Sequence, residues 1–268
     1  MFMHAKNGTL QLKDGSMDYI RFGSGKRMLV MLPGLGDSLR SIKGAALPMA
    51  LLYRRFAKDF TVYSFSRKYP LRAGCTTREL AADQIEAMDL LGIERADLIG
   101  VSMGGMLSQQ LAINYPGRIG KLVLVVTCSE PNPLIIESVN EWMDCARRND
   151  HTALMETNVR RIYSEAYYRR NKWLIPIMGR FTKPTSYDRF FTQAQACLTH
   201  DVRFQLSRIQ SETLVIGGEK DNALGGDPSR VIADAIPGAV LKMYPNGGHG
   251  LYEEEKDFQK CILDFLLK

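Results

Sequence analysis

The chain has 268 residues, of which 45% are hydrophobic and 24% charged, and this length can bury a substantial core within one α/β domain. Its formal charge of +6 comes from 35 basic and 29 acidic residues without a basic tract, so we expect no nucleic-acid partner. No apolar run approaches the roughly 18 residues that span a bilayer, and the first residues lack the apolar stretch of a secretory signal, so we expect a cytoplasmic protein with no membrane partner.

Strands and helices are predicted to alternate along the chain. Two short runs, residues 9–13 and 17–22, flank the turn sequence Asp14-Gly15-Ser16 and predict an opening hairpin. Further strands are predicted over residues 27–32, 61–65, 96–101, 121–126, 213–217 and 240–244. This alternation predicts an α/β fold with a mostly parallel central sheet that helices cover on both faces.

Helix boundaries are marked by capping residues. Thr76 and Glu79 have the spacing of a capping box, and helical periodicity follows them until Gly92. Asp227 before Pro228 predicts the capped start of another helix. The last helix is predicted from an apolar face of five residues: Phe258, Cys261, Ile262, Phe265 and Leu266.

Residues 130–208 interrupt the alternation of strands and helices. They show helical periodicity, many aromatic and arginine residues, and no convincing strand. We therefore predict a core domain of residues 1–129 and 209–268, with a helical cap of residues 130–208 inserted after the sixth strand. Most aromatic side chains of the cap are expected to pack in its interior or against the core, and a minority to line a substrate pocket: Trp142, Tyr163, Tyr167, Tyr168, Trp173, Phe190 and Phe191.

The five cysteines give no sign of a disulfide framework or a zinc site. They are odd in number and scattered, without CxxC spacing, at Cys75, Cys128, Cys145, Cys197 and Cys261. We expect free, buried thiols. No cofactor and no metal ion are implied by the sequence.

The pentapeptide Gly100-Val101-Ser102-Met103-Gly104 joins the strand over residues 96–101 to a helix predicted over residues 102–115. A serine at such a tight turn adopts a strained backbone, and the small neighbours Gly100, Gly104 and Gly105 let the strand and the helix approach. The hydroxyl then projects toward a substrate. The alternative is that Ser102 acts only as a helix N-cap.

An acid and a histidine follow the last two predicted strands. Asp221 closes the segment Gly218-Glu219-Lys220-Asp221, and His249 lies in the glycine-rich loop over residues 245–250. Open α/β sheets gather their active sites at the carboxyl ends of their strands. A serine becomes nucleophilic when a neutral imidazole takes its proton, and a carboxylate holds that imidazole in the right tautomer. We therefore predict Ser102 as nucleophile, His249 as general base and Asp221 as the orienting acid.

Other residues compete for the roles of acid and base. Glu130 follows the sixth strand, and Asp227 lies six positions beyond Asp221, so each is an alternative acid. Asp37 is expected in a turn or a cap. The remaining histidines lack both a strand end and a glycine-rich loop and are expected on the surface or in the cap: His4, His151 and His200.

These motifs resemble those of the α/β-hydrolase superfamily over nearly the whole chain. Residues 29–38 resemble the family's third strand and oxyanion loop, with Pro33-Gly34 where the family usually carries His-Gly. The resemblance implies an oxyanion hole formed by the backbone N–H groups of Leu35 and Met103. Residues 100–105 resemble the corresponding segment of small-molecule esterases and enol-lactonases.

The predicted function is that of a serine hydrolase that cleaves a small-molecule carboxylic ester or lactone through an acyl-enzyme on Ser102. Hydrolysis of a C–C bond, acyl transfer, and a ligand receptor that retains the triad without turnover are the alternatives. Haloalkane and epoxide chemistry need a carboxylate nucleophile at the elbow, and Ser102 argues against both. The expected partner is a small-molecule acyl substrate, and the oligomeric state is left open.

Overall fold

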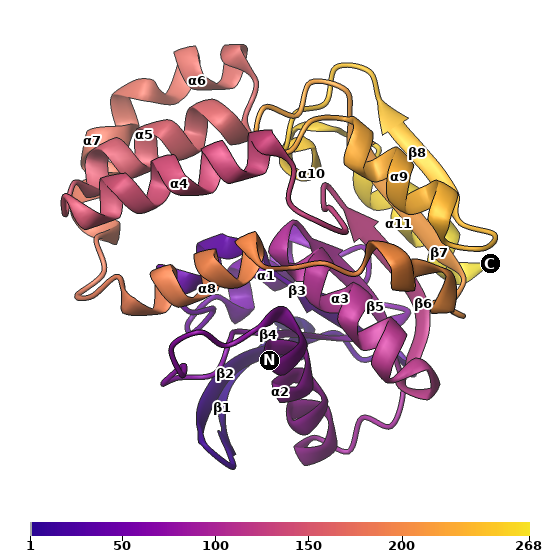
Figure 1. Ribbon diagram of the computed structural model, residues 1–268. Helices are drawn as coiled ribbons and strands as arrows, with labels where there is room; N and C mark the ends of the chain where they lie inside the picture. The colour runs from indigo at the N-terminus through magenta and orange to yellow at the C-terminus, as the bar shows by residue number, and fades with distance from the viewer. Residues whose placement is uncertain (1) are drawn as a thin grey trace.

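An eight-stranded sheet forms the centre of the protein, whose computed structural model describes residues 2–268 (Figure 1). In chain order the strands are β1 (Lys6–Leu12), β2 (Gly15–Phe22), β3 (Arg27–Leu32), β4 (Phe60–Phe65), β5 (Ala96–Val101), β6 (Ile119–Val125), β7 (Thr213–Gly218) and β8 (Val240–Tyr244). Their spatial order is β1-β2-β4-β3-β5-β6-β7-β8. The hairpin β1–β2 and the pair β2–β4 are antiparallel, and the remaining pairs are parallel, so the prediction of a mostly parallel sheet is confirmed.

Each face of the sheet has its own hydrophobic core. Along β3, Val30 and Leu32 pack into one cluster, whereas Leu29 and Met31 pack into the other, as the two-residue period of a strand requires. The first cluster includes side chains of α2 (Thr77–Leu90), α3 (Met103–Asn114) and α9 (Asp227–Ala235). The second includes side chains of α1 (Ala46–Leu52), α10 (Leu251–Glu254) and α11 (Phe258–Leu267). Helices therefore cover both faces, as predicted.

The predicted helix starts are confirmed in one case and wrong in another. The Thr76 hydroxyl oxygen caps α2 by accepting the N–H of Glu79. The Glu79 carboxylate in turn accepts the N–H of Thr76 at 2.8 Å, which completes the capping box. Asp227 does not cap α9, because Gly226 occupies the cap position and the Asp227 side chain, 96% exposed, lies inside the first turn. The sequence patterns also gave no sign of α1.

Five helices lie between β6 and β7. They are α4 (Pro133–Arg147), α5 (His151–Ile162), α6 (Glu165–Asn171), α7 (Ile175–Thr182) and α8 (Asp188–Leu198), which confirms a helical insertion after the sixth strand. Helices α4 to α7 stack above the sheet, whereas α8 returns to it (Figure 1) and packs on the short helix η2 (Leu35–Ser38). The domain limits at residues 130 and 208 stay a prediction. No helix within residues 2–268 has the length and apolar character needed to cross a bilayer.

Candidate active site

Ser102 stands at a sharp turn between β5 and α3. Its backbone has φ 53° and ψ −120°, a conformation that costs an L-residue roughly 1–3 kcal/mol. Bonds on both sides hold it there: the Ser102 N–H donates to Val125 O at 2.9 Å, and the Thr127 hydroxyl donates to Ser102 O at 2.8 Å. Residues at the end of β6 and just after it therefore hold the backbone of Ser102 in this strained conformation.

The glycines beside Ser102 allow the strand and the helix to touch. A Cβ atom on Gly104 would overlap the carbonyl oxygen of Leu32, and one on Gly100 would overlap the hydroxyl of Ser108. A Cβ on Gly105 would lie 2.6 Å from the Cβ of Thr127, closer than side chains pack. At each of these positions a Cβ atom would overlap a neighbouring group, so glycine is required.

His249 and Asp221 are bonded to each other in the interior. Nδ1 of His249 lies 2.8 Å from Oδ2 of Asp221, and both side chains are almost fully buried. The second carboxylate oxygen accepts the N–H groups of Ala223 and Leu224, each at 2.8 Å. Because an ionised carboxylate can only accept, Nδ1 carries the ring proton and Nε2 is left as an acceptor.

Ser102 and His249 line the same cavity. Its volume is about 20 Å³, enough for one or two water molecules. Apart from Ser102 and His249 its lining is apolar or weakly polar: Leu35, Met106, Ile135, Val139, Trp142, Cys197, Ala223 and Leu224. Burial raises the pKa of Cys197 to about 12, so this thiol stays protonated at neutral pH and is not a second nucleophile.

The two predicted oxyanion donors sit at the first residue of their helices. Met103 begins α3 and Leu35 begins η2, and the first N–H groups of a helix have no acceptor within it. The loop that carries Leu35 runs close to the nucleophile, since a Cβ on Gly34 would lie 3.4 Å from the Cβ of Ser102. Within residues 2–268, neither N–H group takes part in a loop hydrogen bond. The positions suit a hole for a negative oxygen.

Asp37 lies in the 3-10 turn η2, as a turn residue is predicted to, and its side chain forms a buried ion pair that the sequence did not indicate. Its Oδ1 accepts the Ser66 hydroxyl at 2.6 Å, and its Oδ2 accepts the N–H of Arg67 at 2.9 Å. Arg189, which comes from α8 in the insertion, donates to the same Oδ2 at 2.7 Å and also to the backbone oxygen of Asp37. The loop that carries Leu35 is thus tied to the helical insertion.

Arg67 also bonds the loop that carries Leu35. Its side chain is fully buried, and its Nη2 donates to the Pro33 carbonyl at 2.6 Å, one peptide before Gly34. Desolvation lowers the pKa of this guanidinium, and the nearby carboxylate of Asp37 opposes that shift. Its Nε and Nη1 are buried without a protein partner among residues 2–268. Sequence patterns missed Arg67 and Arg189, because no local motif marks them.

The alternative candidates for the acid and the base are exposed or are bonded to residues other than His249 and Ser102. Glu130 pairs with Arg203 at 2.6 Å, and Asp227 is exposed. His4 is exposed, as expected, whereas His151 and His200 are buried in the insertion. His200 shares a 2.9 Å bond with the Thr77 hydroxyl, and burial lowers the pKa of its ring to about 4. Within residues 2–268 no group of three His, Cys, Asp or Glu side chains is arranged to hold a metal ion.

The insertion is bonded to the loops that carry the acid and the histidine. The Gly250 N–H, next to His249, donates to Ile162 O at 2.6 Å, and the Ser164 hydroxyl donates to Glu254 at 2.6 Å. On the acid side, the Asn132 side chain donates to Leu224 O at 2.7 Å. Together with Arg189, these bonds connect the insertion to all three loops around the cavity.

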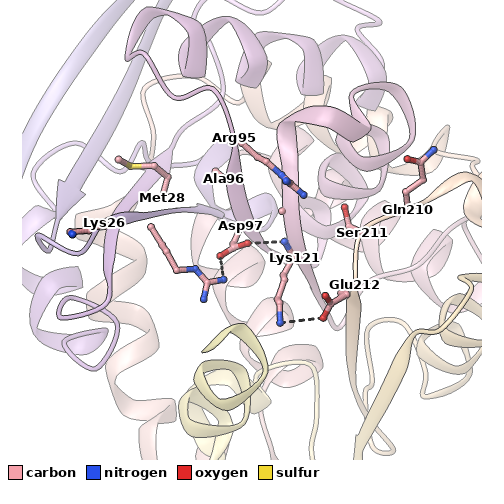
Figure 2. A pocket seen from close by; sticks show the side chains of 11 residues that line it. Lys26, Met28, Arg95, Ala96, Asp97, Lys121, Gln210, Ser211 and Glu212 are labelled. Atoms are coloured by element: carbon pink, nitrogen blue, oxygen red, sulfur yellow. Dashed lines mark hydrogen bonds and ion pairs between the residues drawn. The ribbon is translucent and has the colours of Figure 1, made fainter. Parts of the chain in front are cut away.

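A larger hollow of about 520 Å³ lies at the opposite end of the sheet, near the amino ends of β3, β5 and β6 (Figure 2). Two ion pairs lie in it, Arg27 with Asp97 at 2.7 Å and Lys121 with Glu212 at 3.2 Å, and two further basic side chains, Lys26 and Arg95, also line it. Open α/β sheets bind ligands at the carboxyl ends of their strands, which is where Ser102 and His249 lie. The small apolar cavity is therefore the stronger candidate.

The fold and this site define an α/β hydrolase. Residues 27–256 match the family model described as alpha/beta hydrolase fold, and the chain belongs to that family.

Individual relatives are distant but cover most of the chain. A putative carbamate hydrolase RutD of Pseudomonas savastanoi is 26% identical over 252 residues, covering 89% of this chain and 93% of the relative. A 2-hydroxy-6-oxo-6-phenylhexa-2,4-dienoate hydrolase of Comamonas testosteroni is 29% identical over 190 residues, covering 67% and 65%. The enol-lactonase structure from Burkholderia xenovorans superposes with a TM-score of 0.82 at 22% identity, covering 97% of this chain and all of that one.

Proposed function

We propose that the protein is a serine hydrolase that cleaves a small-molecule carboxylic ester or lactone. One observation carries the proposal: His249, oriented by its bond to Asp221, shares a buried cavity with Ser102 at its strained turn. These are the nucleophile, base and orienting acid of acyl transfer, in the chain order that this fold uses.

The proposed reaction follows from the free ring nitrogen. His249 Nε2 takes the hydroxyl proton as Ser102 Oγ bonds to the acyl carbon, and the carbonyl electron pair moves onto oxygen. The N–H groups of Leu35 and Met103 stabilise that oxyanion, each donor lowering the barrier by about 3 kcal/mol. Collapse of the intermediate expels the alcohol, which takes the proton from the imidazolium. Water then repeats these steps and releases the acid.

The cavity lining favours a neutral, apolar substrate. Its side chains include no lysine or arginine, so a carboxylate on the substrate would lose its hydration without gaining a counter-ion. The helix α4 contributes Ile135, Val139 and Trp142 to the wall. Because the cavity has a volume of only about 20 Å³, a substrate must displace part of this wall when it binds. Four buried free cysteines are consistent with a cytoplasmic site of action.

Two other hydrolytic reactions are second candidates because relatives carry those names. A carbamate carbonyl could be attacked by the same serine, as the name of the Pseudomonas savastanoi relative suggests. Hydrolysis of a dienoate, which the name of the Comamonas testosteroni relative gives, fits the alternative of C–C bond hydrolysis and requires a substrate with a carboxylate. The uncharged lining ranks that reaction below ester or lactone hydrolysis.

Labelling with a fluorophosphonate, followed by peptide mapping, tests the nucleophile. We expect one labelled serine, Ser102, and no label in Ser102→Ala, while the matched Ser129→Ala variant labels normally. Turnover of ester, lactone, carbamate and dienoate panels then ranks the reactions. Label at another serine, or none where a known serine hydrolase reacts, would reject the proposal. A single turnover without recycling would instead favour the receptor alternative.

A further inference from the structure

A stripe of apolar side chains faces outward from the insertion. Trp173, Ile177 and Phe181 are 66%, 48% and 81% exposed, and their spacing of four residues places them on one side of a helix. The 3-10 turn η4 (Lys172–Leu174) runs directly into α7, and both junction residues keep helical dihedrals, so the stripe is continuous. Met178, 47% exposed, widens it. We call these four residues the α7 surface.

The α7 surface is the outward side of a helix whose other side is already buried. Ile175 and Gly179 face the protein interior, and a Cβ on Gly179 would lie 3.0 Å from the Thr152 hydroxyl of α5. Helix α7 lies at the outer margin of the insertion, next to α5 and away from the sheet (Figure 1). The exposed apolar side chains are therefore in excess of what this helix needs for packing, and such patches mark interaction sites.

The charged side chains of the segment that carries the α7 surface have one sign. Residues 169–183 contain five basic side chains, Arg169, Arg170, Lys172, Arg180 and Lys183, and no acidic one. Within residues 2–268, only Arg169 among them has a carboxylate partner, Glu165 at 2.7 Å. Arg170, Lys172 and Arg180 are exposed and free of ion pairs.

We propose that the α7 surface docks the protein on the surface of a bilayer that contains anionic phospholipids. Trp173, Ile177 and Phe181 enter the boundary between headgroups and acyl chains, while Arg170, Lys172 and Arg180 contact lipid phosphates. A helix with bulky apolar residues on one side and a basic flank is the pattern of interfacial binding, which needs no spanning segment.

The charge pattern favours a lipid surface over a second copy of the chain. In a symmetric dimer built on this patch, the same basic side chains of both copies would meet across the axis and repel each other. An anionic bilayer neutralises them and accepts the aromatic side chains at the same time. The proposal replaces the expectation of no membrane partner, which rested on the lack of a spanning segment, and it does not depend on the proposed reaction.

Vesicle binding with tryptophan emission tests the docking. The chain has two tryptophans, Trp142 buried beside the cavity and Trp173 exposed on the α7 surface. Vesicles of phosphatidylglycerol and phosphatidylcholine should shift the emission to the blue at low salt, and Trp173→Phe should bind these vesicles without that shift. Pure phosphatidylcholine vesicles should bind more weakly, and high salt should weaken binding to the anionic vesicles.

Paired variants distinguish binding by the α7 surface from nonspecific binding to vesicles. Trp173→Ser with Phe181→Ser, and Arg170→Gln with Arg180→Gln, should each lower the partition coefficient by about tenfold or more. The matched controls, Phe204→Ser at a phenylalanine 84% exposed near the end of the insertion and outside the α7 surface, and Arg78→Gln with Arg208→Gln, should bind like wild type. No binding to anionic vesicles, or equal losses in the controls, would overturn the proposal. A dimer in sedimentation that Phe181→Ser abolishes, without vesicle binding, would assign the surface to a second copy and overturn it too.

Discussion

The strained backbone of Ser102 connects a sequence pattern to a chemical geometry. Its positive φ is held by bonds to Val125 and Thr127, and Gly100 and Gly104 leave room for α3 to approach β5 and the end of β3, respectively. The pattern Gly-x-Ser-x-Gly predicts this turn because each constraint is local in sequence. The bond between Asp221 and His249 was predicted for a related reason: both residues follow strands that end at the same edge.

Asp221→Asn should lower kcat by a factor on the order of 10⁴ while the fold survives. The amide could present an N–H toward Nδ1 and favour the wrong ring tautomer, so that Nε2 no longer accepts the serine proton. Steady-state kinetics on the best ester, with a thermal melt for folding, measure the effect. Glu130→Gln is the matched control, because Glu130 pairs with Arg203 and should leave kcat nearly unchanged. The opposite result would transfer the role of acid to Glu130.

Asp37 marks the limit of residue patterns. It was expected in a turn because aspartate is common there, yet its partner Arg189 lies 152 residues away. No local spacing reports a pair of that separation. The same limit applies to Arg67, whose bond to Pro33 depends on how β4 and the oxyanion loop meet.

At the scale of elements, α8 holds the loop that carries Leu35 through Arg189. Arg189→Gln should lower kcat by about tenfold or more with little change in KM, because a displaced Leu35 N–H would act only on the developing oxyanion. Arg189→Lys should recover part of the loss through the remaining charge. Arg169→Gln, which breaks an exposed pair in α6, is the control and should match wild type.

The outcome depends on whether the loss is catalytic or structural. Removing one partner of a buried ion pair costs stability as well, by about 3–5 kcal/mol in other proteins, so kcat is compared under conditions where thermal melts show a folded variant. A variant that melts earlier but keeps the wild-type kcat would make Arg189 a purely structural residue.

Helix α4, and not the whole insertion, should set substrate choice. Trp142→Phe should change the ratio of kcat/KM between small and bulky esters, because this side chain lines the cavity. Trp173→Phe should leave the ratio unchanged, since its side chain is 66% exposed and does not line the cavity. Competition assays with ester pairs measure the ratio directly. Equal ranking in folded Trp142→Phe would place specificity in the core-domain loops.

The strands were predictable from sequence because the buried central strands are short apolar runs, and β4 and β7 are buried at every position. Helices were less so. Helix α1 is short and lacks a capping side chain, so no signal marks its start. The pair Asp227 and Pro228 correctly predicted helix α9, but its cap lies one residue earlier, at Gly226. The exposed side chain of Asp227 makes no capping bond.

At the scale of the whole molecule, a sheet with a core on each face supports a site that the insertion closes. A mostly parallel sheet and a helical insertion after the sixth strand followed from the alternation of patterns, whereas the spatial order of the strands did not. How the insertion bonds to the three loops did not, because those bonds join backbone oxygens such as Ile162 O and Leu224 O, which carry no sequence identity. The size of the cavity likewise depends on packing that composition does not record.

The stability of the whole molecule should fall between about pH 6.5 and 4 because of His200. Burial lowers the pKa of its ring to about 4, whereas an exposed histidine titrates near 6.5. In this window the unfolded chain binds a proton that the folded protein resists, so the contribution is complete above pH 6.5 and is lost as the pH falls toward 4. The difference corresponds to about 3 kcal/mol.

Urea unfolding at pH 7 and pH 5 measures this loss. His200→Asn places an amide near the position of Nδ1, where it can still bond the Thr77 hydroxyl, but it cannot titrate. We expect a smaller fall in unfolding free energy between the two pH values for this variant than for wild type. His4→Asn, at an exposed position, should behave like wild type. Carboxylates and His151 titrate in all three proteins. The test therefore compares how much the unfolding free energy of each protein falls between pH 7 and pH 5. Equal slopes for His200→Asn and wild type would mean that His200 is accessible to protons in the folded state.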